Sequence, residues 1–209
     1  MYESLRKASV DLDGVAFQRI PIQFGGLAAR AQFWNDSGSY TPTLVTPTFV
    51  TFDGQTLPLR NPPSGYIERK SLKIHTGRKI DPGLRTLLQG ENYRAIVGNT
   101  GRPDKQAWVD MTMERLTEEG FAGILDGVYF KPEGAASEDT KYSVLFKMQQ
   151  EGYEVTHYDD NALTIRRLAL LLPNVNFVLV RDFTSGVLFS EKERKKYPNV
   201  STIALRDYR

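Results

Sequence analysis

Residues 9–17 read SVDLDGVAF, and this stretch decides how the rest of the chain is interpreted. The residues before Asp11 are a candidate strand, and Gly14 marks a turn directly after it. Asp11 and Asp13 lie two positions apart, so in extended backbone both carboxylates face the same side. Two like charges on one side repel each other unless a cation or a shared proton relieves them. The stretch therefore indicates either a cation site or a surface Asp-Gly turn, and the remaining sequence has to distinguish the two.

Composition restricts the classes of protein that this chain can form. It has 209 residues, of which 40% are hydrophobic and 25% charged, which is ordinary for one globular domain, alone or with a sizeable insertion. The net charge of +2 is too small to indicate a nucleic-acid or membrane surface. The chain has no cysteine and two histidines, which excludes disulfides, thiolate zinc sites and histidine-rich metal sites. With no apolar run long enough to span a bilayer and no signal-peptide pattern, we expect a cytoplasmic protein.

From about residue 80 onward, helical and strand patterns alternate in the way that builds a parallel sheet. Glycines follow several of the helical patterns, at Gly90, Gly120 and Gly152, and Asp104 is expected to cap one helix at its start. The chain is therefore predicted to be an α/β protein with an open parallel sheet. The predicted helices cover residues 82–89, 104–119, 140–151 and 161–172, and the predicted strands cover 93–98, 123–130, 153–158, 176–180 and 201–205.

Residues 16–73 differ from the rest of the chain. They are rich in threonine, proline and aromatic residues, and Asp53-Gly54 is a strong two-residue hairpin signal. We expect a β-rich or irregular insertion here, between an α/β core formed by residues 1–15 and 74–209. Because ligands of α/β sheets bind at the carboxyl ends of the strands, an insertion directly after the first strand is expected to form a cap over the site. Structural decoration without such a role is the alternative.

Polar side chains follow the predicted strands at the edge where a ligand is expected. The set consists of carboxylates, a hydroxyl, backbone amides at a turn, one arginine and one lysine. It suits the binding of a hard, oxygen-ligated metal ion together with a phosphate group. A lysine near the start of a helix supplies one of the cations. The members are Asp11, Asp13, Asn99, Thr100, Gly101, Arg102, Lys141, Asp159 and Asp160.

These pieces resemble the four motifs of the haloacid dehalogenase-like phosphohydrolases. DLDGV at residues 11–15 is similar to the first motif, and Thr100, at the end of the strand pattern YRAIVGN, is similar to the second. Lys141 is similar to the third-motif lysine, and Asp159-Asp160 to the acidic fourth motif. The sequence departs from the pattern at the end of DLDGV, where many members carry Thr or Ser instead of valine. The family fold is a Rossmann-like open sheet with an inserted cap, in agreement with the elements predicted above.

The resemblance implies a role for each of these residues. Asp11 is expected to be the nucleophile that forms an aspartyl-phosphate, and Asp13 the acid and base, with its backbone carbonyl on the metal. Dehalogenases of the family lack an acid at the position of Asp13, so the resemblance implies phosphoryl transfer. The other implied roles are phosphate binding by Thr100, Gly101 and Lys141, and Mg²⁺ binding by Asp11, Asp13 and Asp160 with Asp159 in support.

The sequence thus predicts a magnesium-dependent phosphohydrolase that acts on a small phosphomonoester. A phosphotransferase that uses the same aspartyl-phosphate is an alternative, and a catalytically inert binding module of the same fold is a more remote one. His157, inside a predicted strand, is expected to be a packed core histidine and not a metal ligand.

A polynucleotide or nucleotide 3′-phosphatase is the second substrate expectation. The strings TGR (residues 100–102), DTK (139–141) and DD (159–160) are similar to the phosphatase domain of phage-type polynucleotide kinases. Arg102 is accordingly expected to reach a substrate phosphate or a neighbouring nucleotide. The predicted cap adds basic residues that suit a nucleic-acid strand: Arg19, Arg30, Arg60, Arg69, Lys70 and Lys73.

Overall fold

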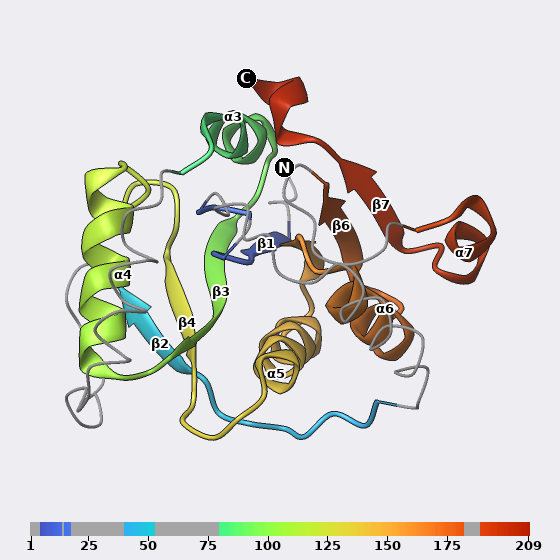
Figure 1. Ribbon diagram of the computed structural model, residues 1–209, viewed down its shortest axis with the longest axis horizontal. Coiled ribbons are helices and arrows are strands. Elements are labelled where there is room, and N and C mark those ends of the chain that lie inside the picture. The colour runs from blue at the N-terminus through green and yellow to red at the C-terminus, as the bar shows by residue number, and fades with distance from the viewer. Residues whose placement is uncertain (1–4, 14, 18–39, 53–79, 182–188) are drawn as a thin grey trace, which may run out of the picture.

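The structure is a computed structural model that describes residues 5–13, 15–17, 40–52, 80–181 and 189–209. Its strands form one seven-stranded sheet in the order β2-β4-β3-β1-β5-β6-β7 (Figure 1). All neighbouring strands are parallel except β2, which pairs antiparallel with β4 at one edge. The strands are β1 (Arg6–Val10), β2 (Thr48–Thr51), β3 (Ala95–Pro103), β4 (Gly127–Lys131), β5 (Glu154–Asp159), β6 (Asn176–Val180) and β7 (Val200–Ile203).

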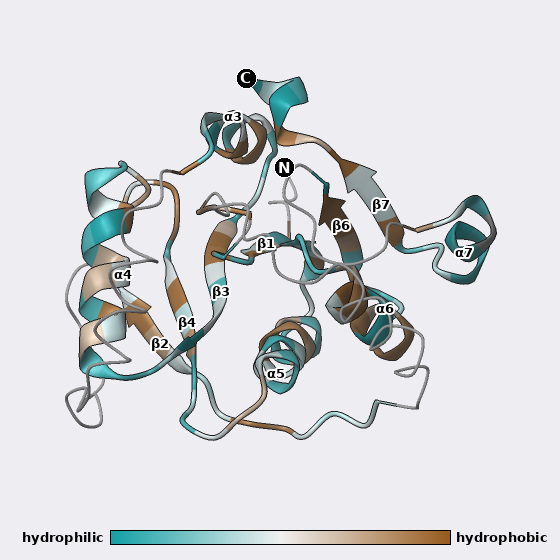
Figure 2. Ribbon diagram, viewed as in Figure 1, coloured by the Kyte–Doolittle hydropathy of each residue, from teal (hydrophilic) through white to brown (hydrophobic). Residues whose placement is uncertain are grey.

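The helices cover both faces of the sheet because the apolar residues of the strands alternate between the faces. In β6, Val178 packs on the side of α3 and α4, whereas Leu179 packs on the side of α5 and α6. The strand is almost wholly apolar, as expected when both faces are covered, whereas α7 is hydrophilic (Figure 2). The helices are α3 (Pro82–Gly90), α4 (Gln106–Glu118), α5 (Ser137–Gln150), α6 (Ala162–Leu171) and α7 (Glu191–Lys196), followed by the 3₁₀ helix η1 (Leu205–Tyr208).

β1 lies at the point where the strand order reverses. It pairs with β3 on one side and with β5 on the other, so that Ser9 is in register with Val97 and with His157. The chain builds outward from β1 through β3 and β4, and then returns to build outward through β5, β6 and β7. Such a reversal leaves a crevice at the carboxyl ends of the central strands, where ligands of open α/β sheets bind. Asp11 follows β1 directly at this position.

The predicted α/β class and its open, mostly parallel sheet are confirmed. Each predicted helix is present within a few residues of its expected bounds, and Gly120 and Gly152 adopt left-handed φ values of 74° and 84° after α4 and α5. The prediction that Asp104 caps α4 is wrong. Lys105 occupies the N-cap position without a side-chain hydrogen bond to the helix amides, while the Asp104 carboxylate accepts a hydrogen bond from the Thr48 hydroxyl at 2.8 Å.

Part of the predicted insertion belongs to the core. β2 completes the sheet edge, and the residues before it cross α5, where the Asp139 carboxylate accepts hydrogen bonds from the Tyr40 hydroxyl and the Thr43 amide. The Val45 amide donates to Ser143 one turn farther along α5. The predicted hairpin at Asp53-Gly54 and the remaining predicted cap, residues 18–39 and 53–73, lie outside the described residues. The cap therefore stays a prediction.

Within the described ranges, no helix is both long and apolar enough to cross a membrane.

Candidate active site

A tight turn after β1 positions the first two candidate residues. The Asp11 amide donates to the Tyr158 carbonyl at 2.8 Å, which continues the pairing of β1 with β5. The chain then folds back, because the Phe17 amide donates to the Leu12 carbonyl at 2.7 Å, and Asp13 and Phe17 form an isolated bridge. Leu12 and Phe17 are fully buried, so the turn is anchored in the hydrophobic core. Leu12, between the two acids, and Phe17, after them, thus fix where the carboxylates lie.

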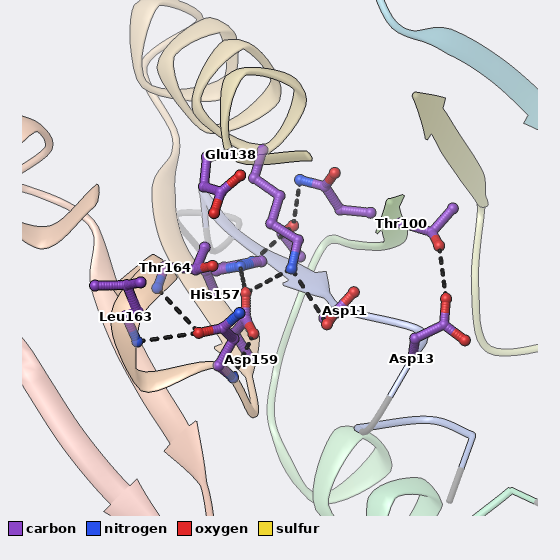
Figure 3. Close-up of polar contacts among 12 residues, drawn as sticks. Asp11, Asp13, Thr100, Glu138, His157, Asp159, Leu163 and Thr164 are labelled. Carbon is purple, nitrogen blue, oxygen red and sulfur yellow. Dashed lines mark hydrogen bonds and ion pairs between the residues drawn. The ribbon is translucent and has the colours of Figure 1, made fainter. Parts of the chain in front are cut away.

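The two acids of this turn have different partners. Asp11 lies on the Asp159 side of the site, whereas Asp13 points toward Thr100 (Figure 3). Lys141 forms an ion pair with Asp11, and Arg102 forms one with Asp13. The repulsion expected of two neighbouring carboxylates is therefore relieved by a separate cation at each.

Lys141 joins two acids that come from different strands. Its Nζ atom lies 3.2 Å from Asp11 Oδ2 and 2.7 Å from Asp159 Oδ2, and all three side chains are buried. Burial alone would lower the pKa of Lys141, but the two carboxylates outweigh it and raise this pKa above its usual value. The lysine is therefore a fixed positive charge beside Asp11.

The segment after β5 holds Asp159 rigidly. The Asn161 amide donates to Asp159 Oδ1 at 2.8 Å, and the Asn161 side chain in turn caps α6 by accepting from the Leu163 and Thr164 amides (Figure 3). Burial would raise the pKa of Asp159, but Lys141 and the hydrogen bond from His157 outweigh it, so this pKa lies far below its usual range. Asp159 is consequently an ionised carboxylate with a fixed orientation.

Three carboxylates at this edge form a group that fits a metal ion. One oxygen from each of Asp11, Asp159 and Asp160 lies within 4.8 Å of the other two, and all three residues are buried. Burial, followed by the neighbouring carboxylates, raises the pKa of Asp11 well above its usual value despite the attraction of Lys141. The group therefore carries more negative charge than Lys141 balances, and oxygen donors of this kind suit Mg²⁺.

The metal ligands predicted from sequence were Asp11, Asp13 and Asp160, with Asp159 in support. The structure brings the carboxylates of Asp11, Asp159 and Asp160 together, whereas the carboxylate of Asp13 is paired with Arg102. Asp13 was expected to contribute its backbone carbonyl, and that part stays a prediction.

His157 is fully buried, which confirms it as a core histidine, but it also has polar partners that the sequence did not reveal. Asn99 Nδ2 donates to Ser9 Oγ at 3.3 Å, Ser9 Oγ lies 3.1 Å from His157 Nδ1, and His157 Nε2 lies 3.2 Å from Asp159 Oδ2. Burial lowers the pKa of His157, which favours the neutral ring. Because the ionised Asp159 carboxylate can only accept, Nε2–H donates to it, and in the neutral ring Nδ1 then accepts from the Ser9 hydroxyl.

The sequence predicted that the second-motif residues follow the strand, but they lie inside β3. Thr100 is buried, its hydroxyl lies 3.4 Å from Asp13 Oδ2, and it accepts a hydrogen bond from the Arg102 amide at 3.1 Å. Gly101 faces the start of α5, since a Cβ atom added there would lie 2.7 Å from Ser137 Oγ. Arg102 donates to both carboxylate oxygens of Asp13, where the sequence predicted a substrate phosphate.

Comparison with known proteins supports the fold on which this site is built. No family model matches the sequence, and no curated protein matches it. Among solved structures, a haloacid dehalogenase-like family hydrolase from Streptococcus pneumoniae matches with a TM-score of 0.50 at 13% sequence identity, over 98% of this chain and 95% of that one. The chain has the fold of the haloacid dehalogenase-like hydrolases. This likeness concerns the fold alone, so the chemistry has to be argued from the site residues of this chain.

Proposed function

We propose that this haloacid dehalogenase-like protein is a magnesium-dependent phosphohydrolase that cleaves a phosphomonoester through an aspartyl-phosphate on Asp11. The observation that carries the proposal is the buried group of Asp11, Lys141, Asp159 and Asp160 at the reversal point of the sheet. It combines a carboxylate that can act as a nucleophile, a fixed cation beside it, and further oxygen donors for a metal ion.

The first half-reaction transfers the phosphoryl group to the protein. A carboxylate oxygen of Asp11 attacks phosphorus, and a new P–O bond to Asp11 forms as the ester P–O bond breaks. The leaving oxygen keeps the electron pair of the broken bond and takes a proton from the Asp13 carboxyl group. Lys141, 3.2 Å from Asp11, offsets the negative charge of the phosphoryl group during this transfer.

The second half-reaction regenerates the protein. A water oxygen attacks phosphorus while its proton passes to the Asp13 carboxylate, and the P–O bond to Asp11 breaks. The products are inorganic phosphate, the free Asp11 carboxylate and a protonated Asp13. Asp13 thus alternates between acid and base, and its partly exposed side chain suits exchange of protons with substrate and water.

Asp11, Asp159 and Asp160 are the residues that would hold Mg²⁺. When bound, the ion would supply positive charge that offsets both the carboxylates and the substrate phosphate. His157 and Asn161 orient Asp159 from behind, as outer partners of metal ligands commonly do.

A small phosphomonoester is the substrate class that we propose. The alternative of a nucleic-acid 3′-phosphate drew on Arg102, on Asp139 and on the basic residues of the predicted cap. Arg102 is bound to Asp13, and Asp139 to Tyr40 and Thr43, while those cap residues lie outside the described residues. Of the two remaining alternatives, an inert binding module has no need of the complete set of acids and lysine, and a phosphotransferase would use the same first half-reaction.

The decisive experiment measures phosphate release from an aryl phosphate, several sugar phosphates and a 3′-phosphorylated oligonucleotide, with Mg²⁺ and with EDTA. We expect release that requires Mg²⁺ and that is lost in Asp11→Asn. Asp13→Asn should lose about 10²- to 10⁴-fold through the missing acid and base. Undiminished release in excess EDTA would contradict the proposal, and a preference for the oligonucleotide that weakens with salt would assign the substrate to nucleic acid.

A further inference from the structure

Arg102 forms a bidentate ion pair with Asp13. Nη2 donates to Asp13 Oδ1 at 2.8 Å, and Nε donates to Asp13 Oδ2 at 3.1 Å. Two parallel hydrogen bonds of this kind fix the plane of a carboxylate as well as its distance, which a single point charge does not do.

Arg102 is itself held from two further sides. Its Nη1 atom donates to Thr112 Oγ1 at 2.8 Å, and the Thr112 hydroxyl donates to the Trp108 carbonyl at 2.6 Å within α4. The guanidinium carbon lies 4.5 Å from the centre of the Phe17 ring, which closes the same turn as Asp13. The group therefore connects β3, α4 and the turn after β1, because Nη1 is bound to α4 while Nε and Nη2 are bound to the turn.

The two members of the pair differ in exposure. The Arg102 side chain is 3% exposed, whereas that of Asp13 is 23% exposed. The arginine thus binds the carboxylate from the buried side and leaves its outer side reachable. A leaving-group oxygen or a water molecule can therefore approach Asp13 from its exposed side while both bonds to Arg102 persist.

We propose that Arg102 is a positioning residue for the acid and base of the reaction, and not a ligand of the substrate phosphate. The inference rests on the proposed function, because it assigns Arg102 to the step in which Asp13 exchanges a proton. Three of the five N–H groups of Arg102 already donate to Asp13 and Thr112, and the buried side chain presents little surface to a phosphate while these contacts are kept. Its buried geometry instead suits a fixed support for the Asp13 carboxylate.

The leaving group separates these two roles. An alkyl phosphate has a poor leaving group that needs the acid, whereas p-nitrophenyl phosphate needs it little, so loss of Asp13 should affect kcat/KM of the alkyl ester far more. A phosphate ligand acts on the part that both substrates share, so its loss should affect both alike. The parameter kcat/KM is suitable because it reports transfer of the phosphoryl group to the protein without the later hydrolysis of the intermediate.

The test measures kcat/KM of Arg102→Gln and Arg102→Lys on both substrates, alone and in the Asp13→Asn background. We expect Arg102→Gln to lose roughly 10- to 100-fold more on the alkyl ester than on p-nitrophenyl phosphate, and to cause no further loss once Asp13 is replaced. Arg102→Lys should recover little, since an ammonium group cannot make both bonds. Arg115→Gln, which removes an arginine from an ion pair on the surface of α4, is the matched control and should retain activity.

Thr112→Val tests the same positioning role if the Arg102 variants fail to fold. It removes only the Thr112 hydroxyl that Nη1 contacts, and it should produce a smaller loss with the same preference for the alkyl ester. Equal losses on both substrates, losses that add to those of Asp13→Asn, or full activity of Arg102→Gln would overturn the inference while leaving the proposed function standing. A wild-type protein that releases phosphate from neither substrate would instead overturn the proposed function.

Discussion

Two buried carboxylates share one lysine, and they are stabilised to very different degrees. Asp159 forms an ion pair with Lys141 at 2.7 Å and also accepts hydrogen bonds from His157 and the Asn161 amide. Asp11 forms a longer ion pair with Lys141, at 3.2 Å. Their pKa values accordingly move in opposite directions, far below the usual range for Asp159 and well above it for Asp11. Asp11 is therefore the acid that gains most from an added cation, which is consistent with its proposed role as the nucleophile.

This difference predicts that Asp11→Asn separates activity from stability. The variant should release no phosphate, because an amide does not replace the carboxylate nucleophile. Since burial raises the folded-state pKa of Asp11 above its unfolded value, the ionised group costs stability at neutral pH, and the neutral amide removes that cost. Thermal unfolding in EDTA should therefore show a Tm equal to or above that of the wild type. A Tm several degrees lower would show that the charged group stabilises the metal-free fold.

The elements show which parts of the fold the sequence could predict. Apolar patterns revealed the helices and most of the strands, and a glycine marked the end of three helices, since these signals are local. The hairpin signal at Asp53-Gly54 predicted extended backbone over TFVT, but it did not reveal that this strand pairs with β4, which is distant in sequence. β3 runs past its predicted end because Pro103 pairs with Lys131, again a contact between distant segments. Local pattern therefore predicted the elements that carry their own signal, and pairing across the sheet determined the rest.

Gly127 tests the contact that makes β2 part of the sheet. A Cβ atom at Gly127 would lie 2.5 Å from the Phe49 ring and 2.6 Å from the Val50 carbonyl, both of which belong to β2. We expect Gly127→Ala to cost roughly 1 to 3 kcal/mol of unfolding free energy, as overpacking does, and to reduce hydrogen-exchange protection of the amides in β2. Gly123→Ala is the matched control, because among the described residues, its chain neighbours aside, no atom lies within 4 Å of its added Cβ atom. Unchanged protection in Gly127→Ala would mean that the sheet edge adjusts without loss.

The capping box of α7 should make stability depend on pH. Burial would raise the pKa of Glu193, but hydrogen bonds from Ser190 and the Arg166 ion pair outweigh it, so this pKa lies below its usual value of 4.5. A depressed folded-state pKa means that the stabilisation is present above pH 4.5 and is lost as the pH falls through the folded value. Urea unfolding should therefore show Glu193→Gln less stable than the wild type at neutral pH, with the gap closing in acid. A gap of constant size would assign the effect to hydrogen bonding without charge.

At the scale of the whole molecule, the parallel sheet explains why the site residues could be predicted together. The ends of β1, β3 and β5 meet at one edge, which brings Asp11, Thr100 and Asp159 close together from segments far apart in sequence. The pairing of Arg102 with Asp13 could not be predicted, because it depends on the turn after β1 and on Thr112 in α4. The contact between His157 and Ser9 could not be predicted either, since it depends on the register of β1 and β5.

The charge of the site predicts that metal binding stabilises the entire fold. Asp11, Asp159 and Asp160 are buried together with Lys141, so the negative charge of these three carboxylates exceeds the positive charge of the lysine between them. A cation that binds only the folded state adds about 2.7 kcal/mol at a hundredfold excess over its Kd, or about 5 to 10 °C in Tm for a chain of this size. We expect Mg²⁺ to raise Tm relative to EDTA, and Asp160→Asn to remove most of this rise.

Glu118→Gln is the matched control for that experiment. It also removes one negative charge, but from an exposed pair with Arg115 on the surface of α4, so the rise in Tm on adding Mg²⁺ should be retained. An equal rise in the wild type, Asp160→Asn and Glu118→Gln would mean that Mg²⁺ acts through general screening of charge. A rise in Tm that is lost in Asp160→Asn and kept in Glu118→Gln would place the ion at the reversal point of the sheet. This result needs no measurement of turnover.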